Sequence, residues 1–373
     1  MFRNAMRLPF KLLGIPISLD TSFLIVLPLF AFLIGLQLPT YLRLLGITPE
    51  PGMLQGSTPY LLGLLAALGL FASVLVHELG HAVAARAFGV QTREITLWLL
   101  GGVAQLTDIP RARGAEAVIA VVGPLTSLAL AGVSAVLRGL VPDVAAGQFL
   151  LGYLALVNLS LALFNLLPAL PLDGGRVLRS LLALRRPYLE ATRTAAGVSR
   201  LIAFAMGIFG LYAFNLFLVL IALFVYMAAS TETEQASLSQ ALEGLRVRDL
   251  MTLEVRSVPP TLSVGELLQR MFLERHMGYP VVEEGRVVGL ISLEDLQGAD
   301  PAAPITERMG KLEAIAPEAS ALEALKRMAE CNFSRLVVME NGRMVGILSK
   351  TDLLRALQVR LVGQTVRPGG SGA

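Results

Sequence analysis

Long runs of apolar residues fill the first 230 positions of this chain, and frequent charged residues return only after them. A helix needs roughly 20 apolar residues to cross a bilayer. Runs of that kind predict spans at about 18–38, 61–87, 115–137, 148–168 and 194–229. The last run fits one long tilted helix or two short spans that reverse near Gly210–Asn215.

Basic residues decide between five and six spans, because positive charge collects on the cytoplasmic side of membrane proteins. Arginines follow the second and the fourth span, and the N-terminus is also basic. Six spans return the C-terminal part to the cytoplasm, whereas five would export it. We therefore predict a multi-pass protein of the cell (inner) membrane, with about six transmembrane helices and both chain ends cytoplasmic. The first apolar run lacks a small-x-small cleavage site, which favours an uncleaved span over a secretory signal.

Residues 92–107 differ from their surroundings because apolar and polar positions alternate there. Ile95, Leu97 and Leu99 alternate, and the Gly101–Gly102 pair follows them. This pattern predicts a short β-hairpin associated with the membrane, whose edge is able to pair with another extended segment. A cytoplasmic loop with apolar packing is the alternative.

From residue 246 onward the chain mixes charged and apolar residues as soluble domains do, and the pattern occurs twice. The segment Val287-Val-Gly289-Leu-Ile-Ser292 returns as Met344-Val-Gly346-Ile-Leu-Ser349. Two copies with βαββα signals predict a paired α/β unit rather than a solenoid. The predicted organisation is a membrane domain (1–230), a linker (231–245), two repeats (246–300 and 301–360) and a disordered tail (361–373).

Composition agrees with this division and excludes several classes of protein. Hydrophobic residues make up 54% and charged residues 16% of the chain, which is too apolar for an ordinary soluble domain. One cysteine, Cys331, excludes an internal disulfide and a CxxC metal site. The net charge of +3 is modest, and the basic residues gather at span ends, so we expect no nucleic-acid partner.

The second apolar run contains two histidines four residues apart, in His77-Glu78-Leu79-Gly80-His81. Residues at i and i+4 share a helix face, so His77 and His81 are able to bind one metal ion with Glu78 beside it. Ionisable residues inside a membrane span are costly and point to function.

Zinc in a catalytic site takes a third protein ligand and keeps a fourth position for water. The candidate is Asp173, in the segment Asn165-Leu-Leu-Pro-Ala-Leu-Pro-Leu-Asp173-Gly174-Gly175. Prolines end the preceding helix and glycines permit a tight turn, so Asp173 is able to point back toward the histidines. Its alternative role is to cap the helix that follows.

These two motifs together resemble the site-2 protease family of intramembrane zinc metalloproteases. The resemblance implies that His77, His81 and Asp173 bind zinc and that Glu78 is the general base. It also implies that Asn165 steadies the substrate or the oxyanion. The family's Gly-Pro element is matched by Gly123-Pro124-Leu-Thr126-Ser127, whereas Asp20 stands where relatives often have histidine.

The repeated C-terminal unit resembles a tandem CBS pair, as in the prokaryotic site-2 proteases that carry such a tail. Such pairs often bind adenine nucleotides such as ATP or AMP. Ser292-x-x-Asp295 and Ser349-x-x-Asp352 match the ribose-binding pattern, although both aspartates fit equally well as helix caps. A homodimerisation module without a ligand is the alternative for this pair.

The expected function is hydrolysis of peptide bonds in or near the transmembrane segments of single-span proteins, regulated by nucleotide. Family analogy names anti-sigma or pro-sigma factors as substrates. The alternatives are an ion transporter regulated by the CBS pair, whose histidines bind a passing cation, and an inactive membrane scaffold. A transporter needs a continuous polar pathway, and few polar residues lie in the apolar runs outside the two motifs.

Overall fold

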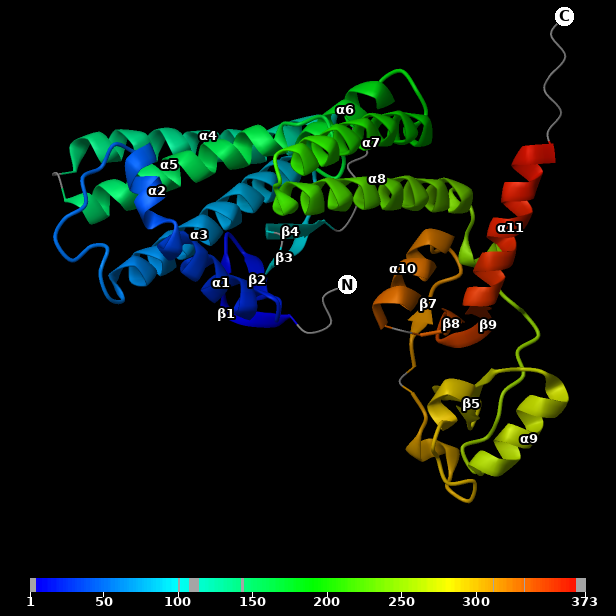
Figure 1. Cartoon of the computed structure of the whole chain (residues 1–373). Helices are drawn as coiled ribbons and strands as arrows, with labels where there is room; N and C mark the ends of the chain where they lie inside the picture. Colours follow the sequence, from blue (N-terminus) through cyan, green and yellow to red (C-terminus); the bar gives the residue numbers. More distant parts are fainter. Residues whose placement is uncertain are drawn as a thin grey trace, which may run out of the picture. The chain divides into compact units, whose positions relative to one another are not determined.

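The computed structural model describes residues 5–99, 101–106, 114–141, 144–310, 312–331 and 333–366. The chain divides into two compact units, Met1–Ala236 and Ser237–Ala373. The first unit contains long helices and a small sheet, and the second contains two α/β repeats (Figure 1). We describe each unit by itself.

Five helices among the described residues are long and apolar enough to cross a membrane. They are α3 (Thr58–Ala87), α4 (Ala115–Leu140), α5 (Ala145–Asn165), α7 (Tyr188–Tyr212) and α8 (Leu216–Leu242). The pair α1 (Phe23–Leu36) and α2 (Leu38–Leu44) is bent by 61° and adds a sixth span if it crosses as one. The prediction of about six spans is confirmed in this sense, and the last apolar run does reverse between α7 and α8.

Glycines let α1 approach α3 backbone to backbone, as small residues do in membrane helix pairs. A Cβ atom on Gly63 would lie 2.1 Å from the Ala31 carbonyl oxygen, and one on Gly35 would lie 2.8 Å from the Pro59 carbonyl oxygen. This close packing holds α3, the helix that carries both histidines, against α1.

The predicted hairpin exists as β3 (Thr92–Trp98) and β4 (Gly101–Leu106), but it belongs to a larger sheet. Two strands that the sequence analysis missed, β1 (Met6–Leu12) and β2 (Ile15–Leu19), complete the order β1-β2-β3-β4. Strand β2 pairs with β3 in parallel, with Ile17 opposite Ile95, whereas the other pairs are antiparallel. Since β2 occupies one side of β3, the hairpin's free edge is β4.

One face of this sheet packs on α3, and the opposite face is polar. Ile15, Ile17 and Ile95 are buried with Ala82 of α3. On the polar face, the Glu94 carboxylate accepts hydrogen bonds from Arg7, Ser18 and Gln105, one from each of the other strands. The sheet is therefore fixed against the histidine helix by its apolar side.

A short helix, α6 (Asp173–Ala183), lies between α5 and α7 and agrees with the helix expected after Asp173. Most of the predicted linker is helical, because residues 231–242 continue α8. This segment contains neither glycine nor proline, and Ala241 and Leu242 join the core of the second unit. No residue in this segment breaks the helix, and burial of Ala241 and Leu242 stabilises its end.

The second unit contains both repeats. The first comprises α9 (Val264–Glu274), β5 (Gly278–Glu283) and β6 (Arg286–Ser292). The second comprises β7 (Ala314–Ile315), α10 (Ala321–Cys331), β8 (Arg335–Glu340), β9 (Arg343–Ser349) and α11 (Lys350–Val366). Short 3-10 helices lie at Val247–Asp249, Leu293–Leu296 and Ile305–Glu307. Because α11 runs to Val366, residues 361–366 of the expected disordered tail are helical, and 367–373 lie outside the described residues.

The two repeats interlock through a methionine and a glycine from each. A Cβ atom on Gly346 would lie 2.8 Å from Met251 Sδ, and one on Gly289 would lie 2.3 Å from Met309 Sδ. Each methionine comes from the segment that opens one repeat and packs on a strand of the other repeat. The reciprocal contact explains why the Val-Gly pair recurs in the sequence.

Candidate metal centre

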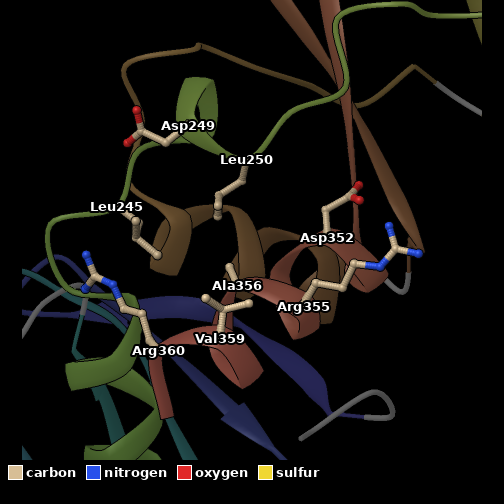
Figure 2. Close-up of a pocket in the computed structure, with 8 residues that line it drawn as sticks. All are labelled: Leu245, Asp249, Leu250, Asp352, Arg355, Ala356, Val359 and Arg360. Atoms are coloured by element: carbon tan, nitrogen blue, oxygen red, sulfur yellow. The ribbon is translucent and has the colours of Figure 1, made fainter. Parts of the chain in front are cut away.

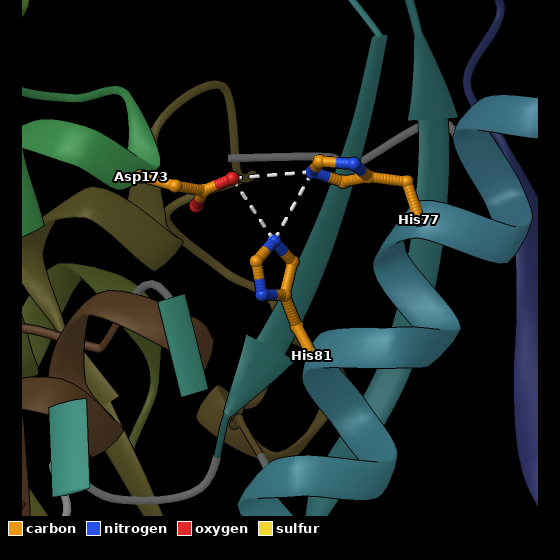
Figure 3. Close-up of side chains that lie close together, drawn as sticks. All are labelled: His77, His81 and Asp173. Carbon is orange, nitrogen blue, oxygen red and sulfur yellow. Dashed lines mark hydrogen bonds and ion pairs between the residues drawn. The ribbon is translucent and has the colours of Figure 1, made fainter. Parts of the chain in front are cut away.

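His77 and His81 project from one face of α3 and bring their rings together (Figure 3). Their Nε2 atoms lie 3.1 Å apart, and the ring planes are inclined by 83°. The spacing of four residues gives this arrangement directly, because the helix brings such residues to successive turns of the same face.

Asp173 reaches the two imidazoles from α6, 96 positions along the chain from His77. Its Oδ2 atom lies 3.2 Å from Nε2 of His77 and 3.2 Å from Nε2 of His81. The exposed fractions of His77, His81 and Asp173 are 4%, 6% and 6%, so the cluster is buried. The N-cap of α6 is Leu172 rather than Asp173, and no side-chain hydrogen bond caps that helix. The carboxylate is directed to the histidines and not to its own helix end.

Two glycines after Asp173 permit the turn that delivers this carboxylate. A Cβ atom on Gly174 would lie 2.3 Å from the Leu166 carbonyl oxygen, and one on Gly175 would lie 2.2 Å from the Leu170 nitrogen. Any side chain at either position would displace the loop between α5 and α6. The same loop is anchored to α7, because the Leu170 N–H donates a 2.7 Å hydrogen bond to Ser199 Oγ.

Helix α4 sets the orientation of both imidazole rings from the opposite side. Nδ1 of His81 lies 2.8 Å from the Ile119 carbonyl oxygen, and Nδ1 of His77 lies 2.9 Å from Ser127 Oγ. A carbonyl only accepts, so His81 Nδ1 carries a proton, and in the neutral ring the Nε2 lone pair then faces the cluster. Partners of this kind fix the tautomer of metal-binding histidines.

Gly123 of α4 lies directly against the donor atoms. A Cβ atom at this position would lie 2.2 Å from His81 Nε2 and 2.8 Å from His77 Nε2. The Gly-Pro element identified in the sequence therefore forms one wall of the cluster. Thr126, from the same element, packs against Gly80 of α3.

The donor set and its spacing fit a zinc ion. Two imidazole nitrogens and one carboxylate oxygen match the ligand set of catalytic zinc sites. In a tetrahedral site with bonds of about 2.0 Å, neighbouring ligand atoms lie about 3.3 Å apart. The three separations of 3.1 to 3.2 Å come close to that value. Buried donors this close to one another need a cation or a shared proton between them.

Glu78 and Asn165 have different surroundings. Glu78 stays out of the donor cluster, and its Oε2 accepts a 3.2 Å hydrogen bond from the Ala104 N–H of β4. It is half-buried, so one carboxylate oxygen remains for another partner. Asn165 ends α5, and its Nδ2 donates to the Leu161 carbonyl oxygen at 2.9 Å. The structure thus places Glu78 beside the cluster, whereas the role expected for Asn165 stays a prediction.

In the second unit, the two Ser-x-x-Asp motifs form the same local structure. Asp295 Oδ2 accepts from the N–H and hydroxyl of Ser292, and Asp352 Oδ2 accepts the same pair from Ser349. Both aspartates therefore act as helix-start residues, which leaves Oδ1 of each for a ligand. Asp352 also lines a cleft of about 440 Å³ together with Asp249, Arg355 and Arg360 (Figure 2).

Sequence reasoning missed the backbone groups of this site. Every residue carries a backbone carbonyl, and every residue except proline carries a backbone N–H. No residue type therefore marks the Ile119 carbonyl or the Ala104 N–H as part of a site. The Ser127 hydroxyl was named only as part of the Gly-Pro element, and its bond to His77 follows from the packing of α4 on α3.

Comparison with known proteins gives the following matches. The model of peptidase family M50 matches residues 65–148 and 143–208, and the CBS domain model matches 247–301 and 309–359. A zinc metalloprotease of Methanocaldococcus jannaschii is 33% identical over 350 residues, which covers 94% of this chain and 95% of that protein. The stage IV sporulation protein FB of Bacillus subtilis is 31% identical over 173 residues, 44% of this chain and 57% of its own. A solved site-2 protease from M. jannaschii has 36% sequence identity and a TM-score of 0.45, and covers 61% of this chain and 95% of its own.

Proposed function

This chain belongs to peptidase family M50, the site-2 proteases, and from this premise we propose that it cleaves peptide bonds in or near transmembrane segments of membrane proteins. It is a multi-pass membrane protein with CBS domains, and the family is one of zinc metalloproteases. The observation that carries the proposal is the buried cluster of His77, His81 and Asp173 on helices of the membrane unit. Family membership disfavours the ion-transporter alternative.

In this proposal the three clustered side chains hold zinc, and Glu78 is the general base. A bound zinc ion supplies Lewis-acid polarisation of the scissile carbonyl and lowers the pKa of water. Glu78 takes a proton from the attacking water and returns it to the leaving amine. Asn165 uses the second N–H of its amide, the one not engaged by Leu161, to donate to the developing oxyanion.

The substrate lies extended along β4 during cleavage. The Ala104 N–H is directed to Glu78, away from β3, and alternate residues of an antiparallel strand face the same way. The backbone groups of Gly102 therefore also face the free edge of the sheet. A peptide that adds to this edge passes beside the general base, and strand addition exposes peptide bonds that a substrate helix would hide.

The physiological partners follow from the family. We propose that the substrates are regulatory single-span proteins such as anti-sigma or pro-sigma factors, and that the CBS pair binds ATP or AMP near Asp352. The N-terminus and the CBS pair lie in the cytoplasm, in keeping with the arginines after the second and fourth spans. Two copies of the chain associate through their CBS pairs.

The test uses purified full-length protein, zinc quantified per chain, and a model single-span substrate. We expect Glu78→Gln to keep its zinc and to lower the cleavage rate by about 10²- to 10⁴-fold, because it loses proton transfer alone. His77→Ala should lose both zinc and cleavage. The control is Glu190→Gln on the exposed surface of α7, which should behave like the unaltered protein. Normal cleavage by Glu78→Gln would refute the proposed mechanism.

A further inference from the structure

A second group of charges, with a buried arginine at its centre, lies in the membrane unit away from the histidines. Arg179 of α6 is 6% exposed and contacts two glutamates. Its Nη1 donates to Glu232 Oε2 at 2.6 Å, and its Nε donates to Glu116 Oε1 at 3.0 Å, with a further contact from Nη2 to the same oxygen. The guanidinium also lies over the Tyr188 ring, 5.3 Å from the ring centroid. Burying a charge is costly, so an arginine held by two carboxylates and an aromatic ring keeps its helices in one arrangement.

The first arm of this cluster joins α6 to the part of α4 that holds a histidine. Glu116 lies in the first turn of α4, one turn before Ile119, whose carbonyl accepts from His81. The adjacent residues add a second tie, because the Ala117 N–H donates to Ser180 Oγ at 3.2 Å. Asp173 begins the same α6 helix, six residues or about 9 Å before Arg179. The position of Asp173 relative to His81 therefore depends on how α6 is held against α4.

The second arm joins α6 to α8. Glu232 lies on α8, the helix that continues to Leu242. Ala241 and Leu242 at that end are buried in the core of the second unit. Arg360, which lines the cleft beside Asp352, donates to the Ala241 and Glu243 carbonyl oxygens. A single helix thus carries both the partner of Arg179 and residues of the CBS core.

We propose that Arg179 is a positioning residue for Asp173, and that Glu232 makes this positioning depend on the placement of α8. This inference rests on the proposed function, since it assigns Asp173 to the zinc site. Loss of either arm lets α6 shift, which moves the carboxylate away from the two imidazoles. The effect falls on zinc affinity and on the chemical step, while substrate binding at β4 is unaffected.

The test compares Arg179→Lys, Glu116→Gln and Glu232→Gln in full-length protein, with Arg185→Lys as the control. Arg185 is exposed just beyond α6, so its substitution leaves the cluster intact. Zinc affinity is measured by competition with a chromogenic chelator, and kcat and KM with the model substrate. We expect Arg179→Lys to weaken zinc binding about 10- to 100-fold, because lysine cannot reproduce the forked contacts. Glu232→Gln should also weaken zinc binding. We expect it to lower kcat and to leave KM within about twofold of the original value.

Zinc affinity and kcat within twofold of the unaltered protein for both Arg179→Lys and Glu232→Gln would overturn the inference. If Arg179→Lys does not fold, the zinc affinity of Glu232→Gln decides by the same criterion. The readouts also separate this inference from the proposed function. An unaltered protein that binds zinc but cleaves no substrate refutes the protease proposal, while the zinc affinities still judge the positioning role.

Discussion

At the scale of single residues, the site depends on glycines as much as on the three clustered side chains. His77, His81 and Asp173 converge only because Gly123, Gly174 and Gly175 leave room for the donor atoms and the loop. The helix spacing of the two histidines was evident in the sequence. The need for glycine at position 123 was not evident there, because it arises from the contact of Gly123 on α4 with His81 on α3, which lie 42 positions apart in the sequence.

Gly123→Ala provides a test of this requirement. The added methyl group would lie 2.2 Å from His81 Nε2, so the ring must move and zinc affinity should fall at least about tenfold. Gly132→Ala is the matched control on the same helix, since a Cβ atom there meets nothing within 4 Å. That substitution should leave zinc content unchanged and alter stability by no more than about 1 kcal/mol. Chelator competition and thermal unfolding measure the two effects, and equal zinc affinities would contradict the crowding argument.

At the scale of elements, the sheet differs most from the sequence-based expectation. The hairpin at 92–107 was predicted from its alternation, but β1 and β2 were missed. The pairing of β2 with β3 places Ile17 opposite Ile95, far away in the sequence, and such a contact leaves no local pattern. This pairing bears on the proposed substrate path, because β2 occupies one side of β3 and leaves β4 as the edge beside Glu78.

Strand addition at β4 predicts a periodic crosslinking pattern. In a Cys331→Ser, Glu78→Gln background, Val103→Cys should form disulfides with cysteines scanned through a model substrate, with yields that alternate every second residue. The control is Phe10→Cys on β1, which lies exposed at the opposite edge of the sheet and should give no pattern. Non-reducing gels measure the yields. A repeat of three to four residues would indicate a helical substrate and contradict the strand model.

At the scale of the whole molecule, one chain joins a zinc protease unit to a pair of CBS domains. Asp352 lines the described cleft with Arg355 and Arg360, and Asp295 has the same local hydrogen bonds to Ser292 as Asp352 has to Ser349. The two repeats therefore share this local structure, and two positive charges line the cleft beside Asp352. These charges support a nucleotide site near Asp352, and Asp295 provides an internal control.

Titrating ATP and AMP against the cleavage rate tests this regulation. We expect the unaltered protein to respond, because a ligand shifts a conformational equilibrium when it binds one state more tightly. Arg355→Met should lose the response by removing a positive charge from the cleft, and Asp352→Ala should lose it together with a helix cap. Asp295→Ala removes the equivalent cap in the other repeat and should keep the response. Equal rates at all nucleotide concentrations in the unaltered protein would dismiss regulation by these ligands.

The sequence alone determined the membrane unit, the paired repeat, and the residues able to bind zinc, because helical spacing and apolar run length are local properties. It also indicated the turn before Asp173, since proline and glycine act on their own backbone. Only the tertiary structure decided what surrounds these residues: the Ile119 carbonyl on His81, the Ala104 N–H on Glu78 and the two glutamates on Arg179. Backbone donors and helix contacts of this kind are set by packing between distant segments, and no residue pattern encodes them one by one.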